Sequence, residues 1–336
     1  SEELINDIKD IREIKMPRAI IAMSGGVDSS VAAFLTKNQG FDMLGVTLAL
    51  TDIESSDITD AKAVATRLGF DHTVVDLKAE FSREVIGRFI DAYENLRTPN
   101  PCIYCNRHIK FGLLGDYAKE NGYSYVATGH YAQITEENGR YILKKGVDAS
   151  KDQSYVLYSM TQDQLAHTIF PISDLSKTEI RSIAEENSLV NASKPDSQDI
   201  CFIPDGDYAK FITDKAGEQQ EGDIILSDGS KLGRHKGLIH YTIGQRKGIG
   251  VSYSEPLFVL DKNTKNNTLI LGTKAEQGCK GLIAEKLNFI SIDKLTGHIE
   301  CTAQTRYHQK DMPCTVSPID DDKMLVEFHQ PHKAVS

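Results

Sequence analysis

The sequence predicts an α/β domain built on a doubly wound parallel sheet, followed by a small central β domain and a C-terminal β-barrel. Three observations lead to this prediction. The apolar, β-branched run Ala19–Ala22 leads through a glycine-rich turn into a helical pattern. Strands and helices then alternate to about residue 130, as they do in parallel sheets. From about Gly222 the chain consists of short strand patterns between Gly, Asn and Asp turns. We therefore place the domains at residues 1–215, 216–276 and 277–336.

The strands of the expected sheet are short and apolar, and the helices between them carry apolar residues at helical spacing. We expect strands at residues 19–22, 43–48, 73–75 and 124–128. We expect one helix from the glycine-rich turn to Gly40, and further helices at residues 58–68, 79–95, 106–119 and 176–186. Parallel sheets bind ligands beyond the carboxyl ends of their strands. The turn at Ser24, the segment after Leu48 and the pair Gly129-His130 lie at such ends, so we expect the functional site there.

The second half of the chain shows a different pattern. We expect short strands at residues 224–226, 239–242, 257–260, 268–271, 282–292, 301–306 and 324–328. Short strands with this turn chemistry are typical of small barrels. A linker near residues 215–221 separates them from the α/β domain.

Composition and charge exclude several classes of protein. The chain has 336 residues, of which 40% are hydrophobic, and a formal net charge of −10. No apolar run approaches the ~18 residues that span a bilayer, and the charged amino-terminal stretch does not resemble a secretory signal. We therefore expect a cytoplasmic protein with no membrane partner. The negative charge lies on residues 1–213, because residues 214–336 carry 16 basic and 16 acidic residues.

The segment Met23–Ser30 has the features of a phosphate-binding turn. Its two glycines let the backbone approach a ligand, its serines offer hydroxyl groups, and the amides that open the next helix favour an anion. Asp28 would repel a phosphate unless a divalent cation lay between them, so it indicates Mg²⁺. Two glycines alone usually mark only a turn. The complete string SGGVDSS at a strand-to-helix junction favours the phosphate site, although it is not the GxxxxGK[ST] loop.

Two stretches are locally basic against the acidic background. Residues 97–110 contain Arg97, Arg107 and Lys110 without an acid, and residues 231–247 contain Lys231, Arg234, Lys236, Arg246 and Lys247 without an acid. Each could be only a solvated face, which is the usual role of a charge run. Together they could also form the electrostatic footprint of a polyanion.

Three of the six cysteines lie in polar segments. Cys102 and Cys105 form a CxxC pair that follows two prolines, so we expect them on a loop before a helix that begins near Asn106. Cys201 ends a polar stretch, where the plain alternative is an inert surface thiol. One CxxC with a distant cysteine indicates redox, sulfur or cluster chemistry. The remaining cysteines fit ordinary small residues of the β region: Cys279, Cys301 and Cys314.

Six motifs then occur in order along most of the chain. They are SGGVDSS, Thr98–Pro101 with Cys105-Asn106 and Lys110-Phe111, Ala127–Tyr131, Lys151–Tyr155, Ser197–Phe202 and His240–Lys247. Together they resemble the motifs of the tRNA-specific 2-thiouridylases, a family of N-type ATP pyrophosphatases. The resemblance implies an adenine-nucleotide hydrolase-like first domain. It also implies an enzyme that uses ATP to adenylate C2 of the wobble uridine of tRNA and then replaces the oxygen with sulfur, giving 2-thiouridine.

The resemblance also assigns roles to residues and partners. It implies that Cys201 bears a persulfide and that Cys105 is the partner nucleophile. The implied ATP-binding residues are Ala22, Met23, Ser24, Gly25, Gly26, Val27, Asp28, Ser29, Leu48 and Gly129. The implied tRNA-binding residues are Asn100, Pro101, Cys102, His130, Lys151, Asp152, Gln153, Arg306 and Tyr307. The implied partners are the anticodon loop of a tRNA and a sulfur donor, which could be a cysteine desulfurase, a relay protein or inorganic sulfide.

Some of these residues have plain structural alternatives. Lys151–Gln153 could be only the amino terminus of a helix. Arg306-Tyr307 could be an exposed strand end.

Two departures from the family pattern matter. Many members carry aspartate where this chain has Cys102. We therefore hypothesise that Cys102, Cys105 and Cys201 hold a 4Fe–4S cluster with one iron left open for sulfide, because three soft thiolates favour iron–sulfur chemistry. The alternative keeps Cys105 and Cys201 as a persulfide–disulfide pair, with Cys102 a spare or resolving thiol. Members also continue past Ser336, so we expect the last barrel to be incomplete.

Two other classes of function remain as rivals. An adenylating ligase of the same superfamily could act on a small molecule, but it would not need three cysteines and a basic β region. A protein that only binds tRNA or metal would not need a pyrophosphate loop. Pyrophosphate release with ATP and bulk tRNA distinguishes these classes.

Overall fold

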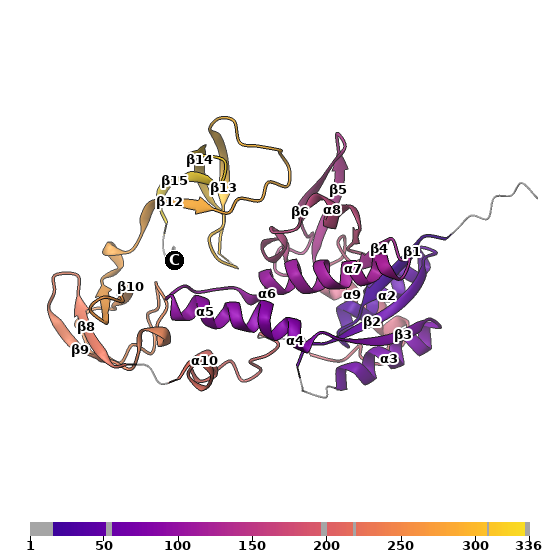
Figure 1. Cartoon of the computed structure of the whole chain (residues 1–336), viewed down its shortest axis with the longest axis horizontal. Coiled ribbons are helices and arrows are strands. Elements are labelled where there is room, and N and C mark those ends of the chain that lie inside the picture. The colour runs from indigo at the N-terminus through magenta and orange to yellow at the C-terminus, as the bar shows by residue number, and fades with distance from the viewer. Residues whose placement is uncertain (1–15, 52–55, 196–199, 218–219, 308, 333–336) are drawn as a thin grey trace, which may run out of the picture. The chain divides into compact units, whose positions relative to one another are not determined.

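The computed structural model describes residues 16–51, 56–195, 200–217, 220–307 and 309–332. The chain divides into two compact units (Figure 1). Unit 1 comprises Ser1–Lys78, Asn106–Ser154 and Met160–Asp196, and unit 2 comprises Ala79–Cys105, Tyr155–Ser159 and Ser197–Ser336. None of the helices in the described ranges combines the length and the apolar composition that crossing a bilayer requires.

Unit 1 is built on a five-stranded sheet in the order β3-β2-β1-β4-β7, and all its strand pairs are parallel. The strands are β1 (Arg18–Ala22), β2 (Asp42–Ala49), β3 (Asp71–Asp76), β4 (Tyr125–Ala127) and β7 (Thr168–Ile169). The central strand β1 has the apolar, β-branched residues that a strand covered on both faces requires. The predicted parallel sheet is therefore confirmed.

Helices cover both faces of this sheet. They are α2 (Val27–Asn38), α3 (Ser56–Leu68), α7 (Leu114–Glu120) and α9 (Lys177–Glu186), and the short helix α8 (Gln162–Ala166) precedes β7 in the chain. Ile21 of β1 packs in one core with residues of α2, α3 and α9, whereas Ile20 packs in another with residues of α7. Successive strand residues point to opposite faces, and both isoleucines are fully buried, so the sheet is doubly wound as predicted.

A hairpin that we did not predict follows β4. Its strands are β5 (Ala132–Glu137) and β6 (Arg140–Lys145), and they pair in antiparallel register. Asn138 and Gly139 connect them, with φ of 53° and 76°. Asn-Gly with two positive φ values is the signature of a type I′ turn, so the sequence did carry a signal for this hairpin.

The segment that carries the CxxC pair is helical, which corrects the predicted loop. Helix α6 (Pro101–Tyr104) leads into the π-helical segment η2 (Cys105–Leu113) and then into α7. The side chain of Asn100 caps α6 by accepting a hydrogen bond from the Cys102 amide at 3.1 Å. Pro101 occupies the first helical position, where its missing amide costs nothing. Proline here begins a helix instead of breaking one.

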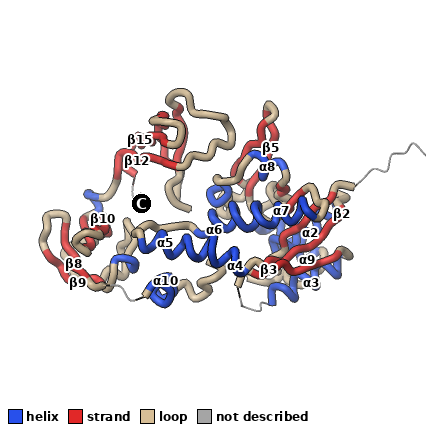
Figure 2. Tube along the Cα trace, in the orientation of Figure 1, coloured by secondary structure: helices blue, strands red, loops and turns tan. Residues whose placement is uncertain are grey.

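Unit 2 contains helices and two four-stranded sheets (Figure 2). Its α- and π-helical segments are α4 (Lys78–Phe81), which begins one residue before the unit, η1 (Ser82–Gly87), α5 (Arg88–Glu94), α6 and α10 (Tyr208–Ala216). The first sheet has the order β10-β11-β8-β9, from β8 (Gly222–Leu226), β9 (Lys231–His235), β10 (Phe258–Asn263) and β11 (Thr268–Gly272). The second has the order β12-β15-β14-β13, from β12 (Cys279–Glu285), β13 (Ile299–Ala303), β14 (Met312–Pro318) and β15 (Lys323–His332).

The all-β character of this region is confirmed, but several details differ from the prediction. Strands β9 and β14 were not expected, and the strand expected at residues 282–292 ends at Glu285. Within the described residues neither sheet closes into a barrel. The expected strand at residues 239–242 is instead a short 3₁₀ turn, Leu238–His240, that follows Gly237 at a φ of 116°. Leu238 and Tyr241 are buried in the core of the first sheet. The apolar run thus reflects burial of an irregular segment and not strand pairing.

Candidate active site

The turn between β1 and α2 has a backbone shape that requires glycine. Gly25 has a φ of 72°, and a Cβ there would lie 2.4 Å from the carbonyl oxygen of Asp57. The turn is anchored to β2, because the Met23 amide donates to the Val46 carbonyl at 2.8 Å. The segment is therefore a fixed turn at the carboxyl end of β1, where parallel sheets bind ligands.

The serines of this turn brace the first turn of α2. Ser29 Oγ and Ser30 Oγ donate to the Gly26 carbonyl at 2.9 and 3.0 Å, and the Ser24 amide donates to Ser29 Oγ at 3.3 Å. Gly26 is the N-cap of α2 and offers no side-chain cap. The first amides of this helix thus lack the usual capping side chain, which suits a helix start that receives an anion.

Gly129, at the carboxyl end of β4, lies against the start of α2. A Cβ at this position would approach the carbonyl carbon of Asp28 to 2.8 Å and the amide nitrogen of Ser29 to 2.9 Å. Strand β1 pairs with both β2 and β4, so the carboxyl ends of these strands meet. Unit 1 therefore brings together the residues predicted to bind ATP, namely Ala22–Ser29, Leu48 and Gly129. Their role in binding ATP stays a prediction.

Asp28, the residue predicted to hold Mg²⁺, has two close partners. Lys177 Nζ lies 2.6 Å from Asp28 Oδ1, and Tyr131 Oη donates to the same oxygen at 2.7 Å. The sequence indicated neither partner; it predicted only that Lys177 lies in a helix over residues 176–186. The Asp28 carboxylate stands at the first turn of α2 and offers oxygen, the hard ligand that Mg²⁺ prefers.

A second polar cluster supports the turn from residues 191–194. Asn191 Nδ2 donates to the Gly25 carbonyl at 2.9 Å and to Ser30 Oγ at 2.8 Å. Lys194 Nζ donates to the same carbonyl at 3.3 Å and pairs with Asp57 and Asp60 at 2.7 and 2.6 Å. Because Lys194 is neutralised by two carboxylates, it anchors the turn and does not offer it a net positive charge.

The three site cysteines differ in accessibility. Cys102 is exposed on α6, Cys105 is 7% exposed at the start of η2, and Cys201 is exposed. The Ser197–Asp199 part of the Cys201 motif lies outside the described residues. A persulfide-bearing thiol must meet a donor, and the exposure of Cys201 is compatible with that role.

The structure does not support the hypothesis of a three-cysteine iron–sulfur cluster. Across the described ranges, no three His, Cys, Asp or Glu side chains are arranged to hold a metal ion, and all three cysteines lie in these ranges. Cys102 and Cys105 are three residues apart in continuous helix, with one exposed and the other buried. The helix that replaced the expected loop thus does not gather these thiols, and no step of the chemistry is assigned to a cluster.

Among the predicted tRNA contacts, His130 is deeply buried. It packs against Phe111 and Phe170, and its Nδ1 lies 2.7 Å from Thr128 Oγ1. Burial, with Lys110 nearby, holds the pKa of His130 well below its ordinary value. The imidazole is therefore neutral near pH 7 in this structure and offers no positive charge to a phosphate.

The stretch Lys151–Gln153 has a structural role that the sequence left open. Asp152 Oδ1 accepts hydrogen bonds from the amides of Gly146 and Ser154, at 2.9 and 3.3 Å. The Gln153 side chain and amide both bond the backbone of Tyr131. The helical turn Ser154–Leu157 follows directly, so the segment does begin a helix. Its role in tRNA binding stays a prediction.

Arg306 and Tyr307 lie in the connection between β13 and β14 and contact other parts of unit 2. Arg306 Nη2 donates to the Ile243 carbonyl at 3.0 Å, and the Tyr307 ring lies 5.9 Å from that of Tyr155. Burial lowers the pKa of the Arg306 guanidinium. These residues are therefore packed in the unit and are not a free strand end.

Strand pairing divides the second basic stretch into two parts. Lys231 pairs with Asp223 at 2.8 Å, and Arg234 pairs with Glu221 at 3.4 Å, so these two charges are offset by acids on or beside β8. Three cations of the stretch are exposed, and no carboxylate within the described residues forms an ion pair with them: Lys236, Arg246 and Lys247. These three are the ones that could contact a polyanion.

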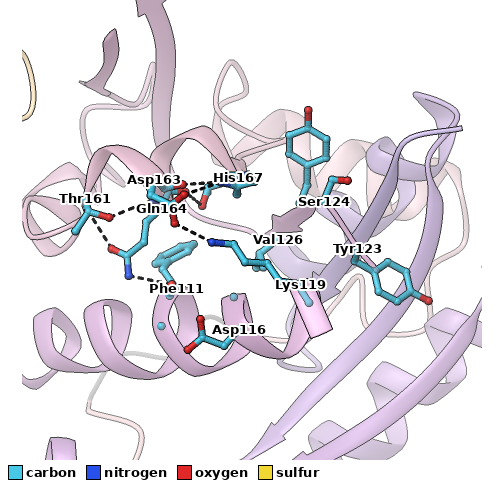
Figure 3. Close-up of a pocket in the computed structure, with 15 residues that line it drawn as sticks. Phe111, Asp116, Lys119, Tyr123, Ser124, Val126, Thr161, Asp163, Gln164 and His167 are labelled. Atoms are coloured by element: carbon cyan, nitrogen blue, oxygen red, sulfur yellow. Dashed lines mark hydrogen bonds and ion pairs between the residues drawn. The ribbon is translucent and has the colours of Figure 1, made fainter. Parts of the chain in front are cut away.

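A cavity of about 260 Å³ in unit 1 lies away from this site (Figure 3). It is lined by the starts of β4 and β7, at the edge of the sheet opposite the glycine turn. Lys119 pairs with Asp163 at 2.8 Å, and Gln164 Nε2 donates to the Phe111 carbonyl at 2.9 Å. None of the residues predicted to bind ATP or tRNA, or to carry sulfur, lines this cavity, so we do not take it as the candidate active site.

Comparison with known proteins assigns the family. The family model described as "tRNA methyl transferase HUP domain" matches residues 17–205. Those described as "tRNA methyl transferase PRC-barrel domain" and "Aminomethyltransferase beta-barrel domain" match residues 209–273 and 279–336. The chain is 46% identical over 338 residues to tRNA-specific 2-thiouridylase MnmA 1 of Thermoanaerobacter sp. (strain X514), covering 96% of this chain and 93% of that protein. The chain belongs to the tRNA-specific 2-thiouridylase family.

A second relative agrees with this assignment. The family member MnmA of Clostridioides difficile (strain 630) is 44% identical over 333 residues, covering 95% of this chain and 92% of that protein. The family predicted from the six motifs is thus confirmed. Among solved structures, a 4-thiouridine synthetase–RNA complex with bound ATP overlaps with a TM-score of 0.41 and 20% identity, covering 56% of this chain and 45% of that chain. A likeness at this level carries no argument about function.

Proposed function

We propose that this chain is an ATP-dependent tRNA 2-thiouridylase acting on the wobble uridine. The observation that carries the proposal is its 46% identity, over nearly its whole length, to a protein named as a tRNA-specific 2-thiouridylase. The glycine turn before α2 supports it independently, because a rigid turn with uncapped helix amides suits the phosphates of ATP. The division into residues 1–215, 216–276 and 277–336 is part of the proposal.

The first step is activation of the uridine. The C2 oxygen attacks the α-phosphorus of ATP, and pyrophosphate leaves, so that a poor leaving group becomes an adenylate. The turn Ser24–Ser29 holds the phosphates, Gly129 keeps its backbone close to the start of α2, and Asp28 offers a carboxylate oxygen to Mg²⁺. A magnesium ion held by Asp28 would neutralise charge on the phosphates.

The second step transfers sulfur. The terminal sulfur of a Cys201 persulfide attacks C2 and displaces AMP. The base is then joined to Cys201 through two linked sulfur atoms. The Cys105 thiolate then attacks the Cys201 sulfur, which releases 2-thiouridine and leaves a Cys105–Cys201 disulfide. An external dithiol reduces this disulfide, and the sulfur donor reloads Cys201. The exposure of Cys201 supports its role as the loaded thiol, and Cys102 is the spare or resolving thiol.

A substitution that separates the two steps tests this assignment. In Cys201→Ser, pyrophosphate release that depends on tRNA should continue, whereas formation of 2-thiouridine should stop, because only the sulfur carrier is lost. Cys279→Ser, in the C-terminal sheet, is the matched control and should keep both. If Cys201→Ser still formed 2-thiouridine at the rate of the unaltered chain, Cys201 would not carry the sulfur.

The exposed cations Lys236, Arg246 and Lys247 bind phosphates of tRNA in this proposal. Replacing all three with alanine should weaken binding and reduce the slope of log K against log salt by about two to three, close to one for each phosphate that is no longer neutralised. Replacing Lys231 and Arg234 is the matched control, because acids already offset their charges. An equal loss of slope in both variants would show that the exposed trio has no specific role.

A further inference from the structure

Two cysteines face each other across neighbouring strands in the second sheet of unit 2. Cys301 of β13 and Cys314 of β14 are directly opposite in the antiparallel register, and their sulfur atoms lie 3.7 Å apart. Residues in this register have Cα atoms about 4.5 or 5.5 Å apart, and both separations lie within the range of about 4.4–6.8 Å that disulfides adopt. A bond between these sulfur atoms therefore requires rotation of the side chains but no movement of the backbone.

The two thiols differ in their access to solvent. Cys314 is fully buried and packs with Val326 and Phe328 in the core of the sheet. Cys301 is exposed, and within the described residues its strand β13 pairs with β14 alone, at the edge of the sheet. Burial also raises the pKa of Cys314 to about 12, so this thiol stays protonated near pH 7. A dissolved reagent can therefore reach Cys301 but not Cys314.

This pairing of an exposed thiol with a buried one suits a two-step exchange. We propose that Cys301 and Cys314 form a redox modification site that reacts with a small-molecule disulfide. The Cys301 thiolate attacks one sulfur of that disulfide, which gives a mixed disulfide and releases one thiolate. Cys314 gives its proton to this thiolate, and its sulfur then attacks the Cys301 sulfur. The Cys301–Cys314 bond forms, and the second thiolate leaves.

The exchange balances without any further reactant. The departing second thiolate takes up the proton that Cys301 released, so two protein thiols become one disulfide and the small disulfide becomes two thiols. A dithiol reverses the reaction by the same steps. The inference is independent of the proposed function, because neither cysteine is assigned to sulfur transfer.

The bond closes the connection that carries Arg306 and Tyr307, two residues predicted to contact tRNA. Cys301 and Cys314 are 13 positions apart in the chain, on the two strands that flank residues 304–311. Loop closure over about this length favours the folded form on the order of a hundred-fold. The amides of β13 should therefore exchange with solvent more slowly in the oxidised protein, by up to about a hundred-fold. Equal exchange in the oxidised and reduced proteins would refute this effect of the bond.

The test incubates the full chain with oxidised glutathione, blocks free thiols with N-ethylmaleimide under acidic denaturing conditions, and digests the protein without reductant. Trypsin separates residues 295–306, which contain Cys301, from residues 311–323, which contain Cys314. We expect mass spectrometry to find these two peptides joined, with the loss of two hydrogen atoms, and to find them separate after a dithiol is added. Glutathione retained on Cys301 beside a free Cys314 would overturn the inference.

Variants test the order of the two steps. Cys314→Ser should stop at the mixed disulfide and keep glutathione on Cys301, because the second thiol is missing. Cys301→Ser should leave Cys314 unmodified, because the reagent cannot reach it. Cys279→Ser, in β12 of the same sheet, is the matched control and should give the joined peptides.

Thermal unfolding establishes that each variant is folded. Glutathione on Cys314 in folded Cys301→Ser would overturn the proposed order of attack. If Cys314→Ser did not fold, the joined peptides of the unaltered chain and Cys301→Ser, which changes an exposed residue, would still decide the question.

Discussion

Gly129→Ala is the most direct test of how the turn and the sheet position one another. The added methyl would lie 2.8 Å from the carbonyl carbon of Asp28, whereas ordinary contacts begin at 3.4 Å. The neighbouring atoms are backbone, so the start of α2 or the end of β4 must move by about 0.6 Å, the difference between these distances. Overpacking of this kind costs about 1–3 kcal/mol of stability.

The effect on activity should exceed the effect on stability. Displacing a site by about 1 Å can cost on the order of a hundred-fold in rate, so we expect a loss of about ten- to a hundred-fold in tRNA-dependent pyrophosphate release. Gly115→Ala is the control: Gly115 lies in α7, a Cβ there would have no neighbouring atom within 4 Å, and alanine should stabilise the helix by about 0.5–1 kcal/mol. Chemical denaturation gives both stabilities. If Gly129→Ala matched the unaltered chain in rate and stability, the close approach of Gly129 to α2 would be wrong.

Three further predictions concern stability and thiol reactivity. Lys262 is 9% exposed, and burial lowers its pKa from 10.5 to about 8. Between pH 8 and 10.5 the unfolded chain therefore binds more protons than the folded chain, so the unaltered protein gains stability as the pH rises. Below pH 8, Lys262→Met should be more stable than the unaltered chain by at most about 3 kcal/mol, and this advantage should disappear by pH 10.5. A pH-independent difference in denaturant melts would contradict this. Burial and the Cys301 contact raise the pKa of Cys314 to about 12. Iodoacetamide at pH 8 should therefore label exposed Cys301 and spare Cys314, which mass spectrometry would report. Equal labelling of both cysteines in the folded chain would show that Cys314 is not buried. Ser176→Ala should remove the cap of α9 and cost about 1 kcal/mol in a denaturant melt, and no loss would mean that the cap does not stabilise the helix.

The features that the sequence predicted correctly are local ones. Ala19–Ala22 is continuous and β-branched, which allows little besides a buried parallel strand, and SGGVDSS requires a strand-to-helix turn. The helix expected at residues 176–186 forms as α9, and its capping box joins two residues three positions apart, Ser176 and Glu179. Each of these signals lies within a few residues, so the sequence order alone contains it.

The features that it missed depend on partners that are distant in the chain or on context. Asp28 and Lys177 are 149 positions apart, so no local pattern joins them. The acids that offset Lys231 lie on a neighbouring strand, and a count of charges along one stretch cannot detect them. Pro101 favours a loop when it is considered only as a helix breaker, although proline at a first helical position with an Asn cap begins a helix.

The central claim is that this chain replaces one oxygen of the wobble uridine with sulfur at the expense of ATP. The most direct test incubates the full chain with Mg²⁺·ATP, a tRNA that lacks the modification, a sulfur donor and a dithiol reductant. AMP and pyrophosphate are then quantified, and the nucleosides are identified by mass spectrometry. We predict one AMP and one pyrophosphate for each 2-thiouridine formed, located only at the wobble position. A methyl group in place of sulfur, or sulfur at another nucleotide, would contradict the claim.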